Sequence, residues 1–196
     1  MARQKRAIRV VARDVVYEGR VIRLIREVLT IKGRRMVRET IQHPGSVVIV
    51  PVLDDGRVVL VRQYRRAVGH ELLELPAGTL DPRETRTACA RRELEEETGW
   101  QARTMRRIGE FYAAPGIINE RMTVFLARGL RKVAAHPEPD ELIRTVILAL
   151  PSALARIESG AICDAKTIIG LLFHFLNGAS GLCRLLPVPQ RRRRRT

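Results

Sequence analysis

Apolar and charged residues alternate in short runs through the first part of the chain, residues 8–42. A period of two is typical of half-buried β-strands, and Gly19 and Gly33 separate the runs as turns do. The pattern predicts a small antiparallel meander with one solvated face. Because two or three strands alone are barely stable, we expect this β-rich subdomain, residues 1–45, to pack on its own chain or on a partner's.

A nearly unbroken apolar run follows at residues 46–53. It predicts a central strand that is buried on both faces, with Pro51 marking an edge or a break. Asp55-Gly56 is a hairpin turn signal, and residues 58–61 return as a second strand. Later strands are expected at residues 107–112, 122–127 and 143–150.

Three segments carry the end signals of helices. The longest, of about 17 residues, has Asp81 as a candidate N-cap, Pro82 at the first helical position, Glu84 in a capping box, and Gly99 just past its end. Shorter helices are expected at residues 152–160, with Ser152 as N-cap, and 164–177. Strands, a helix, strands and helices in this order predict a mixed α+β fold.

The longest predicted helix has an unfavourable distribution of charge, because four of the five residues from 93 to 97 are glutamates. Carboxylates near a helix C-terminus oppose its dipole, and Glu93 repels Glu96 and Glu97 on the same face. The arrangement becomes favourable when a divalent cation lies among the carboxylates, since hard cations prefer oxygen ligands. A solvated acidic helix face is the alternative interpretation.

Composition limits the classes of protein to which the chain could belong. Its 196 residues, 45% of them hydrophobic, suit one domain or one domain with an extension. No apolar run reaches the roughly 18 residues of a membrane span, and the basic N-terminus lacks the apolar stretch of a secretory signal. The three cysteines show neither metal-binding nor disulfide spacing. We therefore expect a cytoplasmic protein.

The formal net charge is +15, and five of the positive charges are Arg191 to Arg195 in the tail, residues 179–196. A basic balance favours polyanionic partners, either nucleic acids or phosphorylated small molecules. Aromatic residues make up only 4% of the chain, and none are interleaved with a basic motif, so nucleic acid is the weaker interpretation. A nucleic-acid-binding protein that uses the arginine tail remains the alternative from a different class.

The acidic helix carries the chain's most specific motif. Gly78, Glu84 and the run Arg92-Glu93-Leu94-x-Glu96-Glu97-x-Gly99 resemble the Nudix box at every fixed position. The one departure is Trp100, where that family usually carries an aliphatic residue. Further stretches resemble the ADP-ribose pyrophosphatase branch, and the likeness covers roughly residues 10–178: Arg62-Gln63-Tyr64-Arg65, Glu74-Leu75-Pro76-Ala77-Gly78, Pro115-Gly116 with Glu120, and residues 164–170.

The resemblance implies an α/β/α Nudix sandwich over residues 46–178. The β-rich subdomain, residues 1–45, would precede it and exchange across a two-fold homodimer, and the basic tail lies outside the likeness. The implied activity is metal-dependent hydrolysis of ADP-ribose to AMP and ribose 5-phosphate. Hydrolysis of another nucleoside diphosphate sugar or dinucleotide, such as GDP-mannose, is the alternative within the family.

The resemblance also implies roles for individual residues. Glu93, Glu96, Glu97 and the backbone carbonyl of Ala77 would bind Mg²⁺ or Mn²⁺, which would neutralise charge on the diphosphate. Glu96 and Arg92 are the expected catalytic residues of the box, and orientation of the carboxylates is the structural alternative for Arg92. Arg62 and Arg65, beside the metal loop, are expected to grip phosphate. The other expected substrate contacts are Tyr17, stacking on adenine from the partner subunit, Glu120 and Pro115.

A general base is expected on the acidic loop before the last strand, where Glu141 fits the family position best and Glu138 is the reserve. We predict that Glu141→Gln lowers turnover strongly, because an amide cannot accept the proton, while metal binding stays near normal. Steady-state kinetics and a metal titration of the two variants, Glu141→Gln and Glu138→Gln, measure this. Unchanged turnover would remove Glu141 from the mechanism.

Overall fold

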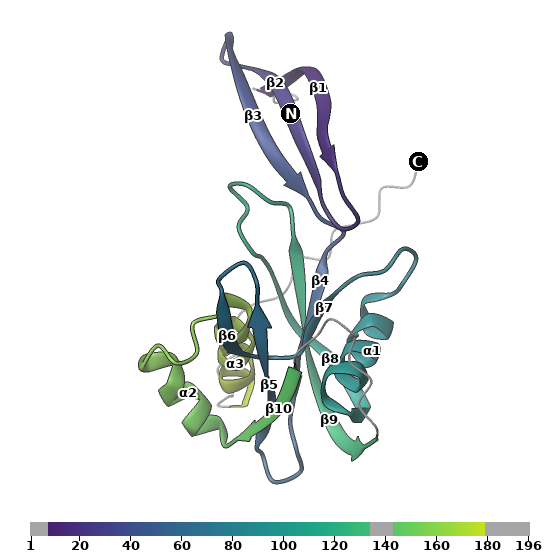
Figure 1. The fold of residues 1–196 in the computed structure, drawn as a ribbon, viewed down its shortest axis with the longest axis vertical. Helices are drawn as coiled ribbons and strands as arrows, with labels where there is room; N and C mark the ends of the chain where they lie inside the picture. Colours follow the sequence, from purple (N-terminus) through teal and green to yellow (C-terminus); the bar gives the residue numbers. More distant parts are fainter. Residues whose placement is uncertain (1–7, 134–142, 179–196) are drawn as a thin grey trace, which may run out of the picture. The chain divides into compact units, whose positions relative to one another are not determined.

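The computed structural model describes residues 8–133 and 143–178, which contain ten strands and three helices (Figure 1). Internal contacts divide the chain into two compact units. The first ends at Gly45 and also takes in residues 112–121, and the second holds the remainder.

The first unit is built on an antiparallel sheet in the order β1-β2-β3. Its strands are β1 (Ile8–Glu18), β2 (Arg23–Ile31) and β3 (Arg34–Gln42). Lys32 and Gly33 both have positive φ angles and form the tight turn between β2 and β3. The predicted meander is confirmed, but every residue of β1 is exposed, so this strand has no buried face among the described residues.

Residues 112–121 attach to the end of β3 in the first unit. The Ile41 amide donates to the Ile117 carbonyl at 2.8 Å, and the Asn119 amide donates back to the Ile41 carbonyl at 3.1 Å. The His43 amide donates to Asn119 Oδ1 at 2.7 Å. Glu120 therefore lies beside His43, with 3.7 Å between its Oε1 and His43 Nδ1.

The second unit contains a four-stranded sheet in the order β7-β4-β9-β8. β4 (Ser46–Pro51) is its central strand and is buried along its whole length, as predicted. It runs parallel to β9 (Arg121–Lys132) and antiparallel to the short β7 (Ala77–Thr79), with β8 (Trp100–Tyr112) at the edge. Pro51 is the last residue of β4, where its missing amide hydrogen is tolerated.

A three-stranded antiparallel sheet, β10-β5-β6, completes the strands of this unit. Its members are β10 (Ile143–Leu148), β5 (Val58–Arg65) and β6 (His70–Glu74). Gly56 has a φ of 83° in the predicted turn, but β4 and β5 do not form a hairpin. They share only one bridge, Val52 with Val58, and then diverge into different sheets.

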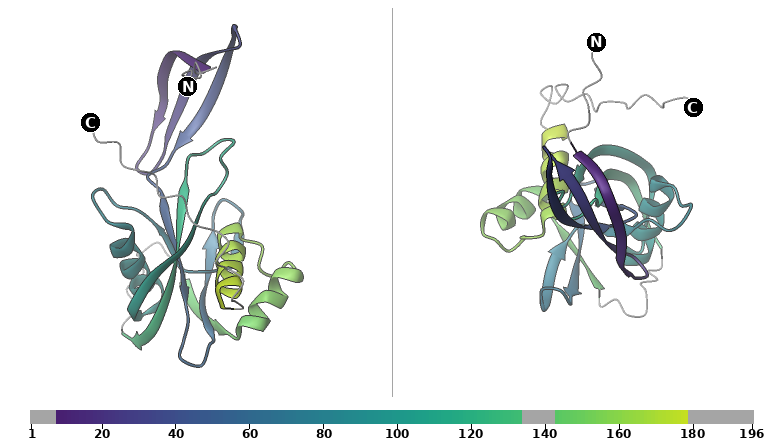
Figure 2. Two further views of the ribbon diagram at one scale, coloured as in Figure 1. Left: turned by 180° about the vertical axis from the view of Figure 1, so that it is seen from behind. Right: turned by 90° about the horizontal axis from the view of Figure 1, so that it is seen from above.

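Helices lie on both sides of these strands, α1 (Arg86–Thr98) on one side and α2 (Leu150–Glu158) with α3 (Ala165–Gly178) on the other (Figures 1 and 2). Alternate residues of β4 pack on its two opposite sides. Val48 and Val50 belong to the core cluster beneath α2 and α3, and Val47 and Ile49 to the cluster beneath α1. The predicted α/β/α sandwich is confirmed. Among the described helices, none is long and apolar enough to cross a membrane.

Two helix starts differ from the prediction. α1 is capped by Thr85, whose Oγ1 accepts from the Ala88 amide, and not by Asp81. Arg83 has a φ of 70°, in the left-handed region, so the helix cannot extend back through it. Glu84 still accepts from the Asp81 amide at 3.3 Å, but this contact closes a turn. α2 begins after Ala149 and not at Ser152. The predicted end of α1 at Gly99, with a φ of 64°, is confirmed.

Candidate functional site

The backbone that follows β6 lies directly against the acidic end of α1. Glu97 is only 4% exposed, and its Oε2 accepts a hydrogen bond from the Ala77 amide at 3.1 Å. At Gly78 an added Cβ would stand 1.9 Å from the Glu93 carboxyl carbon. Only glycine therefore permits this approach with Glu93 in its present position.

Arg92 offsets the repulsion among the carboxylates. Its guanidinium contacts Glu96 at 2.9 Å, Glu93 at 2.8 Å and both carboxylate oxygens of Glu84 at 3.1 Å. These hydrogen bonds from Arg92 hold the pKa of Glu84 below its ordinary value, against the smaller opposing effect of burial. The contacts are those expected of a residue that orients carboxylates.

Lys132, from β9, supplies a cation at the C-terminal end of α1. Its Nζ donates to the Thr98 carbonyl at 3.1 Å and lies 4.9 Å from the centre of the Trp100 ring. A cation at this end interacts favourably with the helix dipole. No local pattern in the sequence identifies it, because Lys132 lies 34 residues from Thr98.

The donors near Ala77 suit a hard divalent cation. Carboxylates at i, i+3 and i+4 on one helix face lie beside backbone that Gly78 lets approach closely. Within residues 8–133 and 143–178, no three acidic, histidine or cysteine side chains are already gathered as an ion's ligands. Instead, Glu93 and Glu96 contact Arg92, and Glu97 contacts the Ala77 amide. The residue types fit the metal.

The comparison with protein families decides the affiliation. Residues 42–166 match the model of the NUDIX domain, which is more than half of the chain. The chain belongs to the Nudix family. The resemblance seen in the sequence is thereby confirmed, and the carboxylates of α1 are those of its Nudix box.

Several curated relatives match along most of their length. The ADP-ribose pyrophosphatase of Bacillus subtilis is 35% identical, over 83% of this chain and 90% of the relative. The protein of the same name from Mycobacterium tuberculosis is 36% identical, over 83% of this chain and 80% of the relative. The GDP-mannose pyrophosphatase of Citrobacter koseri is 37% identical, over 69% of this chain and 74% of the relative.

Among solved structures, the crystal structure of an ADP compounds hydrolase superposes with a TM-score of 0.78. It covers 90% of this chain and 98% of its own, at 23% identity. At that identity the likeness supports the α+β Nudix fold alone.

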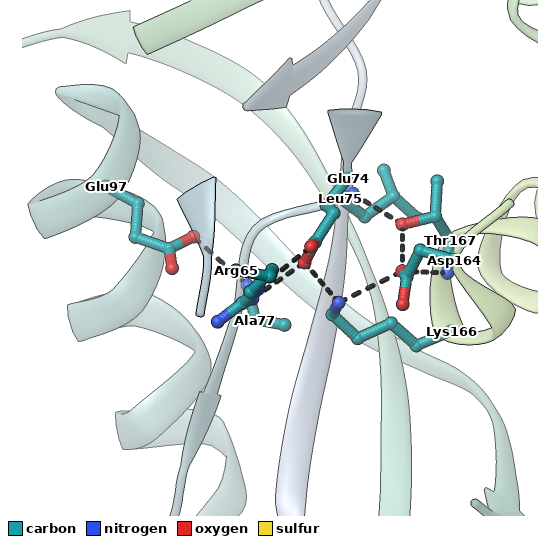
Figure 3. Close-up of polar contacts among 8 residues, drawn as sticks. All are labelled: Arg65, Glu74, Leu75, Ala77, Glu97, Asp164, Lys166 and Thr167. Carbon is teal, nitrogen blue, oxygen red and sulfur yellow. Dashed lines mark hydrogen bonds and ion pairs between the residues drawn. The ribbon is translucent and has the colours of Figure 1, made fainter. Parts of the chain in front are cut away.

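A buried ionic network lies behind the Nudix box (Figure 3). Glu74 is 1% exposed, and Arg65 donates two hydrogen bonds to its carboxylate, at 2.9 and 2.7 Å. Lys166 of α3 also donates to Glu74, and contacts Asp164 at 3.0 Å. Burial by itself raises the pKa of Glu74, but the hydrogen bonds from Arg65 and Lys166 and their charges outweigh it and hold this pKa below its ordinary value.

The other expected site residues are not brought together with the Nudix box by any described contact. Arg65 is committed to Glu74, which favours a structural role over phosphate binding. Arg62 is half-buried on β5. The three remaining substrate candidates belong to the first unit: Tyr17 and Pro115 are exposed, and Glu120 is half-buried. The two candidate bases, Glu141 and Glu138, and the arginine tail, Arg191 to Arg195, lie outside the described residues.

Sequence reasoning assigned no role to Glu74, Asp164, Lys166 or Thr167, which the structure joins behind the Nudix box. One signal was available. Glu74 stands between Leu73 and Leu75 in a strand, and an acidic residue at such an apolar position needs a buried cation as partner. Nothing local identified Lys166 as that cation, since it lies 92 residues away.

We predict that Glu74→Gln destabilises the protein by about 3–5 kcal/mol near pH 7, because it leaves two cations without their shared carboxylate. Since the pKa of Glu74 is lowered on folding, its stabilisation is complete above the ordinary value of 4.5 and is lost as the pH falls through the lowered pKa. The gap between variant and wild type should therefore close in acid. Urea unfolding at a series of pH values measures it.

Glu71→Gln is the matched control, since Glu71 pairs with Arg144 at 2.8 Å on the exposed surface. Exposed pairs contribute roughly 0–1 kcal/mol, so its effect should be small. Equal losses of stability for the two variants would contradict the prediction.

Proposed function

We propose that this protein hydrolyses the pyrophosphate bond of ADP-ribose, giving AMP and ribose 5-phosphate, with the help of Mg²⁺ or Mn²⁺. One observation carries the proposal: the backbone of Ala77 and Gly78 lies against Glu97 and Glu93 of the Nudix box. This contact brings a candidate carbonyl ligand beside the carboxylates that the family motif requires. The ADP-ribose pyrophosphatases among its relatives support the choice of substrate.

Each residue has a role that its chemistry supports. Glu93, Glu96, Glu97 and the Ala77 carbonyl would hold the cation, and Arg92 contacts the carboxylates of both Glu93 and Glu96. When bound, a divalent cation neutralises charge on the diphosphate and activates water. Arg62, on β5, is proposed to bind phosphate. Glu141 is the proposed base.

The competing substrate is another nucleoside diphosphate sugar. The GDP-mannose pyrophosphatase among the relatives makes GDP-mannose the specific alternative. Both substrates present the same diphosphate to the Nudix box, so the choice rests on the residues that contact the base and the sugar. A direct comparison of the two substrates decides between them.

We predict that ADP-ribose is cleaved with a higher kcat/KM than GDP-mannose, and that Glu97→Gln lowers kcat by about a hundredfold or more, since one charged ligand is lost. Release of AMP from ADP-ribose and of GMP from GDP-mannose, with added Mg²⁺ or Mn²⁺, is the measurement. Glu95→Gln is the matched control, because Glu95 lies on the same helix but hydrogen-bonds Gln101 at 2.8 Å. The proposal fails if no diphosphate is cleaved or if Glu97→Gln is as active as wild type.

We further propose that two copies of the chain form a dimer in the cytoplasm through the first unit. β1 exposes apolar side chains on both of its faces, and such a surface on a three-stranded sheet favours a protein partner. The residues are Ile8, Val10, Val11, Val15, Val16 and Tyr17. A partner's strand would cover them, and Tyr17 would then be available to the neighbouring site. The cytoplasmic assignment is supported by Cys89 and Cys163, which are both free thiols.

We predict a mass of two chains in light scattering, and a monomer for Val16→Glu, because a charge buried at the interface is costly. Arg34→Glu introduces the same glutamate side chain at an exposed position of β3, and this variant should remain dimeric. A monomeric wild type would refute the dimer, and a dimeric Val16→Glu would exclude β1 from the interface.

A further inference from the structure

The turn that begins α3 holds the backbone that follows β6. Asp164 Oδ2 accepts from the Thr167 amide at 3.0 Å and from its hydroxyl at 2.6 Å. Because the hydroxyl proton is directed to Asp164, the Oγ1 lone pairs remain for another donor. That donor is the Leu75 amide, at 2.8 Å. Thr167 and Leu75 are both fully buried, so water cannot replace this contact.

Leu75 also packs its side chain on α3, at Gly170. A Cβ added to Gly170 would lie 2.5 Å from Leu75 Cδ1, and 3.5 Å from Val50 Cγ2. Only glycine lets the helix come this close to Leu75 in its present position. The helix therefore restrains Leu75 through both its amide and its side chain.

The next two residues are held by other elements. The Ile49 amide of β4 donates to the Pro76 carbonyl at 2.9 Å, and the Ala77 amide donates to Glu97 of α1 at 3.1 Å. Three consecutive residues thus have backbone contacts to α3, β4 and α1 in turn. Figure 3 shows Thr167 and Asp164 on one side of this segment and Glu97 on the other. A shift at Leu75 would be transmitted to Ala77 within two residues.

We propose that Thr167 is a positioning residue for the metal site: its hydroxyl fixes Leu75, and so keeps the Ala77 carbonyl at the acidic face of α1. The inference rests on the proposed function, in which Ala77 and the Nudix box carboxylates bind a divalent cation. Thr167 itself contacts Leu75 and Asp164, and acts on the cation only through the backbone. Residues that support ligands in this way typically change metal affinity by about 10–100-fold when they are replaced.

Thr167→Val tests the proposal, because it keeps the shape of the side chain and removes the hydroxyl. We expect Mn²⁺ binding, followed by electron paramagnetic resonance without substrate, to weaken by about tenfold or more. Thr167→Ser keeps the hydroxyl and should restore the affinity to within about twofold of wild type. The Mn²⁺ concentration that gives half-maximal hydrolysis should rise in parallel for the valine variant alone.

Ile162→Val is the matched control for a loss of stability without a loss of positioning. Ile162 is buried in the same core cluster as Leu75, and the change removes one methyl group without touching the hydrogen bonds of Thr167. It should lower the melting temperature and leave Mn²⁺ affinity unchanged. If Thr167→Val does not fold, Gly170→Ala is tested in its place, because the added Cβ displaces Leu75 and the Thr167 hydroxyl is kept. Gly178→Ala is the control for this variant, since a Cβ at Gly178 meets no other atom within 4 Å.

The outcomes separate the two levels of inference. Wild-type Mn²⁺ affinity in Thr167→Val, or in Gly170→Ala where it is used, overturns the role of Thr167 and leaves the proposed function intact. An equal loss of affinity in Ile162→Val also overturns it, because general destabilisation then explains the effect. If wild type neither binds Mn²⁺ nor cleaves a diphosphate, the proposed function itself has failed.

Discussion

The hydrogen bond from the Ala77 amide to the buried carboxylate of Glu97 joins the two parts on which the site depends. A buried carboxylate is costly unless it is hydrogen-bonded, so Glu97 requires this backbone to stay close. The helix in turn stays close because Leu94 is buried in the cluster that contains Val47 and Ile49 of β4. Ala77 and Glu97 therefore meet because β4 pairs with β7 and also packs against α1.

The charges of α1 illustrate how tertiary contacts stabilise a helix that would be poor alone. Asp81, Glu84, Glu93 and Glu96 all pair with the guanidinium of Arg92. Lys132, from β9, contacts the Thr98 carbonyl. Both cations offset repulsion that the helix's own sequence creates. Glu93 and Glu96 can thus lie on one helix face with Arg92 as a shared partner.

Local patterns allowed much of the fold to be predicted. The apolar run of β4, the glycine after α1 and the spacing of the Nudix box each depend on neighbouring residues, and the structure agrees with the strand and the helix end. The start of α1 could not be predicted, because the left-handed backbone at Arg83 leaves Thr85, and not Asp81, as the cap. The Asp55-Gly56 turn was recognised, but not that the strands beside it enter different sheets.

The site was predictable only in part, because some of its contacts join elements that are distant in the sequence. The glutamates follow a helical spacing that can be read directly, whereas the partners of Glu74 come from β5 and from α3. An arginine just before the Nudix box suggests a phosphate ligand. Only the three-dimensional contacts reveal that Arg65 already has a buried carboxylate as partner. Pairing between distant elements is not encoded in any local pattern.

The two-sided burial of β4 has a consequence for how the protein becomes active during folding. One set of its side chains packs beneath α1 and the alternate set beneath α2 and α3. An intermediate with helices docked on a single side would leave Leu75 or Glu97 without its anchor. The chain would then become compact before it could turn over substrate. The recovery of activity after dilution from denaturant would follow the docking of the last helix.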